Sequence, residues 1–322
     1  MEEISYPKPL LKWIGGKTQL LEKVLSKFPT VMTTYHEPFV GGGSVLFAVL
    51  ELRRIGIFTI QTVRAYDINS KLITFYKHIQ THKEELYQLL QTYKNIYNSI
   101  TTIKIPVEEE DKTKKRKLLQ QLRKPSTIEE AIQSREAYYY WLREQFNHSV
   151  EGSLTQSALL WVLNKTDFRG MYRESSNGFN VPFGNYKGTV SFIVKEDLDR
   201  IHNLLQGVVF ECVGFDISLS NVSSGDFVYT DPPYVPELST SFVDYVEDGF
   251  DKKKHDTLFS LLRKLPSIGV GYVCSNSNIP WVCELFSNEA SIETVDAKRS
   301  IHFKKPQTKT KEIIIWNVNY GN

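Results

Sequence analysis

Residues 35–69 constrain the fold of this chain more than any other stretch. YHEPF at 35–39 is typical of a short strand, FVGGGS at 39–44 of a tight turn, and the apolar run at 44–54 of a helix. VRAYDIN at 63–69 predicts a second strand with Asp67 at its tip. This order of strand, glycine-rich turn, helix and strand ending in an acid favours a doubly wound sheet that binds a nucleoside.

The alternation of strands and helices pauses after this unit and resumes later. Segments of helical periodicity lie at 71–98, 129–148 and 154–163, and residues 164–188 are typical of a structured loop or hairpin. After residue 205 we expect strands at 208–215, 226–230 and 267–277, a helix at 251–265, and a strand, basic turn and strand at 301–318.

These segments predict an α/β fold: a doubly wound, mostly parallel sheet with an inserted, mainly helical domain. We divide the chain into a first part of the sheet domain at 1–72, an insert at 73–190 with a hairpin near 164–188, and a second part of the sheet domain at 191–322.

The composition is that of a globular protein, with 41% apolar and 24% charged residues. The sequence contains no run of 18 apolar residues, so we expect no transmembrane helix. The N-terminus lacks the basic-then-apolar profile of a secretory signal. Cys212, Cys274 and Cys283 show no metal-binding spacing, so we expect a reducing, cytoplasmic setting and no bound metal.

The net charge is only +2, so any nucleic-acid surface must come from local clustering. Residues 105–127 contain such a cluster, because 112–124 hold seven Lys or Arg residues. The stretch is either a solvated, mobile connection or a stripe that contacts phosphates.

LKWIGGKTQLL at 11–21 resembles part of a phosphate loop, but the pattern G-x-x-x-x-G-K-[ST] would require glycine where Leu11 stands. The pattern therefore disfavours a triphosphate site. The tryptophan, glycines and lysine instead suit a backbone that approaches a flat, charged ligand.

YTDPPY at 229–234 follows an apolar strand, at the edge where open α/β sheets bind ligands. Pro232 and Pro233 stiffen the backbone and remove two N–H donors, which leaves carbonyl acceptors beside the Asp231 carboxylate and the Tyr234 ring. An acceptor cluster beside an aromatic face suits a planar ring with an exocyclic amine. The alternative is an ordinary proline-rich turn.

Three glycines at 41–43 let the backbone pass close to a ligand, and Asp67 is placed to accept the hydroxyls of a ribose. Glu37, just before the turn, serves either a charged amino group of a ligand or a structural hydrogen bond.

Five segments in this order, LLKWIGGKTQLL, HEPFVGGGSVLF, AYDINSKLI, NKTDFRGMYRESSNGFNVPFGNYK and VYTDPPY, closely resemble the Dam-type adenine-N6 DNA methyltransferases of the D12 class, alpha group. The resemblance runs from about residue 8 to 316. It implies a Rossmann-like methyltransferase fold, S-adenosylmethionine as methyl donor, no metal, and an insert that recognises double-stranded DNA.

The resemblance also implies residue roles. The catalytic motif would be Asp231, Pro232, Pro233 and Tyr234. The cofactor would contact Trp13, Gly15, Lys17, Glu37, Phe39, Gly41, Gly43, Asp67, Phe215, Asp216 and Asp231. Lys17 would lie near its methionine carboxylate, and Phe215 and Asp216 near its adenine.

DNA contacts are implied for Lys12, Arg169, Met171, Arg173 and Pro182, with Arg able to grip guanine O6 and N7. Phosphate or scaffold contacts are implied for Asn164, Lys165, Tyr172, Asn180 and Tyr186. The chain departs from many relatives at Asp167, where they carry an uncharged residue. GATC is the leading target, although related enzymes read other sequences.

The expected chemistry is methyl transfer to N6 of an adenine flipped out of the duplex. Cytosine-C5 methylation is rejected, because no cysteine lies in a Pro-Cys motif. Three alternatives remain: a catalytically idle DNA-binding relative, the same chemistry at another short DNA site, and a methyltransferase that acts on RNA or on a protein amide. We expect a monomer or weak dimer, with any cognate restriction endonuclease acting separately.

Overall fold

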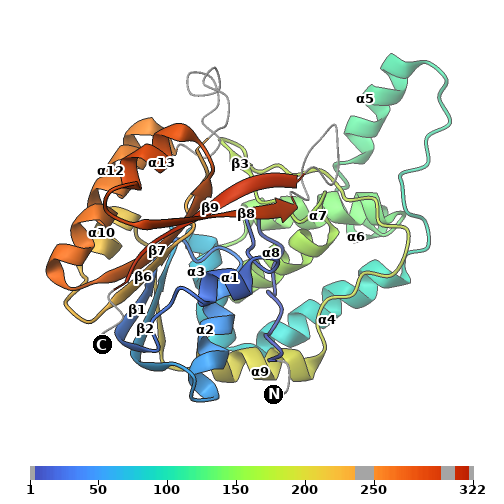
Figure 1. The fold of residues 1–322 in the computed structure, drawn as a ribbon. Helices are drawn as coiled ribbons and strands as arrows, with labels where there is room; N and C mark the ends of the chain where they lie inside the picture. Colours follow the sequence, from blue (N-terminus) through green and yellow to red (C-terminus); the bar gives the residue numbers. More distant parts are fainter. Residues whose placement is uncertain (1–3, 236–249, 299–308, 319–322) are drawn as a thin grey trace. The chain divides into compact units, whose positions relative to one another are not determined.

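The computed structural model describes residues 4–235, 250–298 and 309–318 of the chain (Figure 1). The chain forms two compact units. The first consists of residues 1–8, 15–69 and 206–322, and the second of residues 9–14 and 70–205. The division of function between 1–72, 73–190 and 191–322 stays a prediction.

A seven-stranded sheet forms the centre of the first unit, in the order β5-β2-β1-β6-β7-β9-β8. All described pairings are parallel except those of β9, which runs antiparallel to β7 and β8. The predicted α/β fold with a mostly parallel sheet is thereby confirmed. The strands are β1 (Val31–Glu37), β2 (Thr59–Tyr66), β5 (Val208–Glu211), β6 (Phe227–Thr230), β7 (Gly271–Ser277), β8 (Ser291–Lys298) and β9 (Lys309–Asn317).

Several strand boundaries differ from the predicted ones. β1 and β2 begin earlier, because their parallel pairing already starts at Val31 and Thr59. The strand predicted at 208–215 ends at Glu211, and α10 (Phe215–Ser220) begins directly after Gly214. The strand predicted at 267–277 starts only at Gly271, after a 3₁₀ helix at Leu265–Ile268. Of the stretch predicted at 301–318, residues 301–308 lie outside the described residues.

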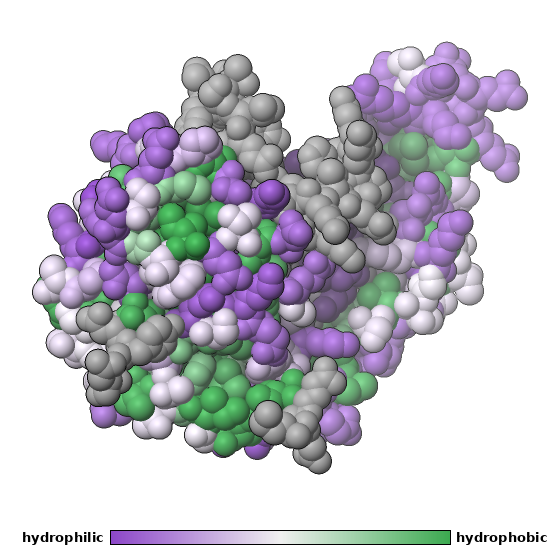
Figure 2. Space-filling view, in the orientation of Figure 1, coloured by the Kyte–Doolittle hydropathy of each residue, from purple (hydrophilic) through white to green (hydrophobic). Residues whose placement is uncertain are grey.

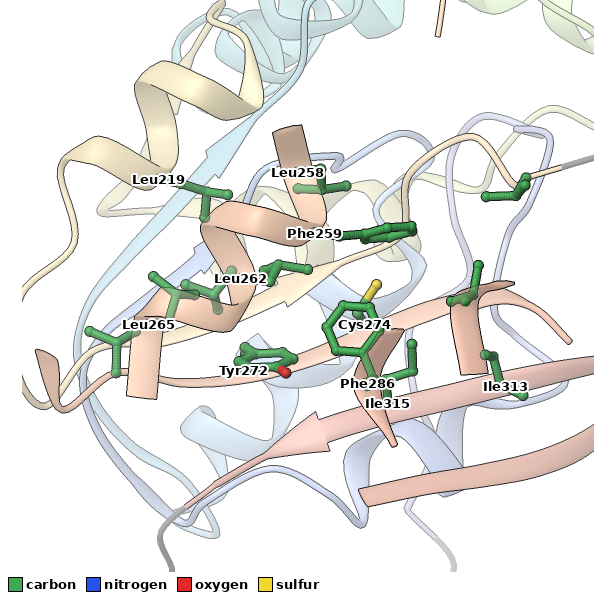
Figure 3. Packing of buried hydrophobic residues seen from close by; sticks show 14 of the residues in the cluster. Leu219, Leu258, Phe259, Leu262, Leu265, Tyr272, Cys274, Phe286, Ile313 and Ile315 are labelled. Atoms are coloured by element: carbon green, nitrogen blue, oxygen red, sulfur yellow. The ribbon is translucent and has the colours of Figure 1, made fainter. Parts of the chain in front are cut away.

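Helices cover both faces of this sheet (Figure 1). On one face lie α10, α12 (Lys252–Lys264) and α13 (Pro280–Phe286), and on the other lie α1 (Leu21–Leu25) and α2 (Ser44–Arg54). Leu258, Phe259 and Leu262 of α12 pack with Tyr272 and Cys274 of β7 (Figure 3). Burial of this apolar surface is the main force that holds the helices on the sheet.

Side chains alternate along β6 and reach both layers. Val228 belongs to the core cluster beneath α12. Phe227 and Tyr229 instead contact the ring of Phe28, with centroids 4.6 and 5.7 Å apart. The strand that leads into residue 231 is therefore buried on both sides, which fixes where that residue emerges.

The second unit is mainly helical. Its helices are α3 (Ser70–Thr81), α4 (Lys83–Ser99), α5 (Lys112–Leu122), α6 (Ile128–Ala131), α7 (Arg135–His148), α8 (Leu154–Thr166) and α9 (Lys195–Leu205). Trp161 lies fully buried in the middle of α8. The hairpin expected at 164–188 is present from residue 167 onward, with β3 (Glu174–Ser175) paired to β4 (Gly178–Phe179). Residues 164–166 instead form the last turn of α8, which ends at Thr166.

The helix α5 corrects the expectation for 105–127, where no helix was predicted. The Asp111 side chain accepts hydrogen bonds from the backbone N–H groups of Thr113 and Lys114, which caps the first turn. None of the residues of α5 is buried, so no hydrophobic rhythm was available to reveal it.

Replacing Phe259 by alanine is expected to lower the free energy of unfolding by about 3–5 kcal/mol. The ring is fully buried and lies 5.7 and 5.4 Å, between centroids, from Trp281 and Phe286. Chemical denaturation measures the loss. The control Ile268→Ala removes a half-exposed side chain and should change stability by less than about 1 kcal/mol. Equal losses in both variants would contradict the assignment of this core.

Candidate active site

The glycine turn at 39–44 is held by Asp67. The backbone N–H of Gly41 donates to Asp67 Oδ2 at 3.1 Å, and that of Asn69 donates to Oδ1 at 3.0 Å. Gly41 and Gly43 have φ values of 46° and 75°, in the left-handed region that favours glycine. Burial raises the pKa of Asp67, and these backbone hydrogen bonds oppose the rise. The glycine turn and Asp67 therefore lie together in the structure, while the contact of Asp67 with a ribose stays a prediction.

Asp231 lies directly after β6 and is paired with a buried lysine. Lys17 Nζ donates to Asp231 Oδ2 at 2.7 Å and to the carbonyl oxygen of Gly15 at 2.6 Å. The Lys17 side chain is only 4% exposed. Burial raises the pKa of Asp231, and the charge and hydrogen bond of Lys17 limit that rise. Lys17, expected near the methionine carboxylate, here contacts the aspartate of the catalytic motif.

The DPPY loop, residues 231–234, is fixed by side chains of β7 and β9. Tyr234 Oη donates to Glu312 Oε2 at 2.8 Å. The backbone N–H of Val235 donates to Asn276 Oδ1 at 3.2 Å, and Ser277 Oγ donates to the Val235 carbonyl at 2.7 Å. Sequence reasoning missed these three supporting residues. The one available signal was an acid, Glu312, directly before the apolar residues 313–316 of β9.

Other predicted cofactor residues surround the glycine turn. The ring of Phe39 stacks on Phe215 with centroids 5.8 Å apart, and Asp216 follows in the first turn of α10. Glu37 is 2% exposed and accepts a hydrogen bond from Tyr35 Oη at 2.7 Å. Burial raises the pKa of Glu37 to about 8, against the effect of the Tyr35 hydrogen bond. The structural hydrogen bond considered for Glu37 is present, and its role toward an amino group of a ligand stays a prediction.

In the second unit, Asn164 joins Lys12 to the recognition hairpin, residues 164–188. The Lys12 backbone N–H donates to Asn164 Oδ1, and Asn164 Nδ2 donates to the Lys12 carbonyl, both at 2.8 Å. Asn164 Nδ2 also donates to the Gly170 carbonyl at 3.3 Å. A Cβ on Gly170 would lie 2.4 Å from the Cβ of Lys12, so only glycine allows this approach. Lys12 and the hairpin are thus one rigid piece.

The predicted DNA-reading side chains are carried by this piece. Lys12, Arg169, Arg173 and Pro182 are exposed, and Met171 is half-buried. Arg173 Nε donates to Asn180 Oδ1 at 2.6 Å, which directs the guanidinium group. Arg169, Met171, Arg173 and Pro182 lie on the hairpin, and Lys12 is bonded to it through Asn164. Their contacts with DNA stay predictions.

Two further features of this piece were not predicted from the sequence. Trp13, expected in the donor pocket, stacks on Tyr172 of the hairpin with centroids 5.3 Å apart. Arg169 has a φ of 68°, which is rare for a residue other than glycine and marks a strained turn.

Asp167 anchors the hairpin from inside. It is fully buried, and its Oδ1 accepts the backbone N–H of Gly170 at 2.6 Å while its Oδ2 has no hydrogen-bond partner. Burial raises the pKa of Asp167 to about 8, with the Gly170 bond and the charge of Lys12 opposing the rise. Asp167 is therefore a structural group, away from the exposed surface.

The sheet with one reversed strand, the glycine turn beside Asp67 and the DPPY loop after β6 define a Rossmann-like methyltransferase fold. A family model of the D12 class N6 adenine-specific DNA methyltransferases matches residues 13–301, and the chain belongs to this family. Within the described residues, no group of three or more His, Cys, Asp or Glu could hold a metal ion. No helix in this part of the chain is long and apolar enough to cross a membrane.

Curated relatives cover almost the whole chain. The Type II methyltransferase M.MjaIII of Methanocaldococcus jannaschii is 31% identical, over 96% of this chain and 99% of its own. The Type II methyltransferase M1.LlaDCHI of Lactococcus lactis subsp. cremoris is 28% identical, over 98% and 96%. The DNA adenine methylase of Haemophilus influenzae is 27% identical, over 95% and 92%.

Replacing Asp167 by asparagine tests its buried carboxyl group. The pKa of Asp167 is about 8 when folded, against an ordinary value of 3.8, so the stability this group contributes is complete below about pH 4 and is lost as pH rises towards 8. Asparagine keeps an acceptor for Gly170 and cannot ionise. The free energy of unfolding of wild type, minus that of Asp167→Asn, should therefore fall as the pH rises over this range.

Denaturation curves at several pH values measure this difference. Asp197→Asn, which changes an exposed aspartate of α9, is the control and should follow wild type. A difference between wild type and Asp167→Asn that stays constant with pH would contradict the raised pKa.

Proposed function

We propose that this protein transfers a methyl group from S-adenosylmethionine to N6 of an adenine flipped out of duplex DNA, with GATC as its target. The observation that carries the proposal is the pairing of Asp231 with buried Lys17 in the DPPY loop, at the carboxyl end of β6. The family to which the chain belongs and the names of its relatives support the same chemistry.

The DPPY loop offers acceptors to an exocyclic amine. The positive charge of Lys17 favours the ionised form of Asp231, and a carboxylate only accepts hydrogen bonds. Asp231 and the Pro232 carbonyl would accept the two N6 hydrogens and hold the nitrogen lone pair towards the donor. Positioning and electrostatics then supply most of the catalysis.

The first unit fits the donor at the glycine turn. Left-handed Gly41 and Gly43 bring backbone close to a ligand without a Cβ in the way. The Asp67 carboxylate accepts backbone N–H groups of the turn and of residues 68 and 69, and its remaining lone pairs would accept the two hydroxyls of a ribose. When bound, S-adenosylmethionine supplies a methyl group activated by its sulfonium charge.

The second unit fits DNA at the recognition hairpin. Exposed Arg169 and Arg173 are suited to guanine edges in the major groove, and Pro182 to neighbouring backbone. Extruding the adenine costs stacking energy, and stacking on an aromatic ring such as Tyr234 returns roughly 1–3 kcal/mol. We propose that the protein acts as a monomer or weak dimer, and that any cognate restriction endonuclease acts separately.

The helix α5 would add affinity without sequence preference. Lys112, Lys115, Arg116 and Arg123 line one groove along it, together with Leu119. Figure 2 shows this segment as a strongly hydrophilic surface. Such a surface would contact phosphates of flanking DNA, and each contact would steepen the salt dependence of binding.

The function is tested by transfer of labelled methyl groups to a genome in vitro, followed by mapping of the modified adenines. Asp231→Ala should abolish transfer and leave donor affinity largely intact, because it removes an acceptor of the target amine. Asp67→Ala should mainly weaken donor binding, measured by calorimetry. Binding of DNA without any N6 methylation by wild type would favour the idle DNA-binding relative instead.

Comparing a hairpin variant with an α5 variant distinguishes contacts with DNA bases from contacts with phosphates. Arg173→Ala should relax sequence choice by about 1–3 kcal/mol of discrimination at one base pair. The double variant Lys115→Ala/Arg116→Ala should leave sequence choice intact and reduce the slope of log affinity against log salt by about 2, at roughly 0.9 per phosphate contact.

Binding to matched and mismatched duplexes at several salt concentrations gives both quantities. Lys253→Ala/Lys254→Ala in α12 serves as a charge-matched control. If Arg173→Ala weakens binding to every sequence equally, Arg173 is a phosphate contact, and an unchanged slope in the α5 variant would exclude that helix from the interface.

A further inference from the structure

Glu312 lies at a point of β9 where the sheet brings it to the DPPY loop. β9 is the reversed strand between β7 and β8, and Glu312 pairs in register with Ser277 and Val295. Its side chain accepts the hydrogen bond of Tyr234 Oη at 2.8 Å, and the residue is only 9% exposed. Hydrogen bonds to a charged acceptor are stronger than those between neutral groups. This contact therefore holds the outer end of the tyrosine.

The Tyr234 ring is fixed from two further directions. Lys17 Nζ lies over the ring, 4.9 Å from its centroid, and so occupies one face. At the other end, the backbone of Val235 is bonded to Asn276 and Ser277 of β7. With the hydroxyl, one face and the backbone all held, the ring has one orientation and a base can stack only on its remaining face.

We propose that Glu312 is a positioning residue that fixes Tyr234 as the stacking platform for the flipped adenine. This inference rests on the proposed function. Glu312 acts through Tyr234 and itself touches neither donor nor base. Loss of its carboxylate lets the ring rotate, so that the extruded base loses stacking while the acceptors at residues 231 and 232 remain in place.

A double-mutant cycle on Glu312→Ala and Tyr234→Phe tests the contact. Each single change removes one end of the hydrogen bond, and each is expected to raise KM for duplex DNA about tenfold with a smaller effect on kcat. Both changes remove the bond between Tyr234 and Glu312, and Tyr234→Phe also removes the hydroxyl that stabilises the Asp231 carboxylate. The double variant should therefore be little worse than Tyr234→Phe alone. Glu312→Gln keeps an acceptor and should restore most of the loss.

Fluorescence of 2-aminopurine in place of the target adenine reports base flipping independently of turnover. Glu312→Ala should lower this signal, and the control Glu293→Ala, which removes a β8 glutamate paired with Lys27, should not. Independent, multiplying effects of the two changes, or a full fluorescence signal in Glu312→Ala, would overturn the inference.

The same cycle measured by chemical unfolding tests the contact without any substrate. Non-additive losses of stability support the bond between Tyr234 and Glu312, and additive losses contradict it. A wild-type protein that never methylates DNA would instead count against the proposed function, so the two failures are distinguishable.

Discussion

The ion pair between Lys17 and Asp231 joins residues 214 positions apart and sets the chemistry of the site. A lone buried carboxyl group would take up a proton and become a hydrogen-bond donor, which would face the hydrogens of an amine unproductively. Lys17 favours the ionised form through its bond to Oδ2, and the Tyr234 hydroxyl also stabilises the carboxylate. A carboxylate has about four lone pairs, so acceptor capacity remains. Left-handed Gly15 turns its carbonyl onto the same ammonium group, which explains why glycine and lysine stand so close in GGKT.

Features encoded locally could be predicted from the sequence. The glycines at 41–43 and the acid Asp67 each follow the carboxyl end of a strand in one strand–helix–strand unit, and the parallel pairing of β1 with β2 brings these ends together. The hairpin at 164–188 was marked by its turn residues in the same way. Strand ends were less certain, because the pairing that extends β1 to Val31 depends on its neighbour β2 and not on local residues.

The supports of the DPPY loop could not be found in this way. Asn276, Ser277 and Glu312 meet residues 234 and 235 only because β7 and β9 are adjacent in the sheet. Nothing in the spacing of these residues encodes that adjacency. The helix α5 was not predicted, although its causes are local. It depends on an Asp111 cap and intrinsic helix propensity, and it buries no side chain that would give a periodic signal.

In the hairpin, the side chains proposed to contact DNA are different from those that fix the backbone. Arg169 and Arg173 are exposed, whereas Asn164 and Asp167 are buried and bonded to backbone groups. The left-handed conformation of Arg169 costs roughly 1–3 kcal/mol and persists only where surrounding structure fixes the turn. Asp167 and Asn164 supply that fixation through Gly170. Because the buried residues carry the geometry, we expect substitutions at exposed positions of the hairpin to leave the turn intact, so that the proposed DNA contacts can vary while the fold is kept.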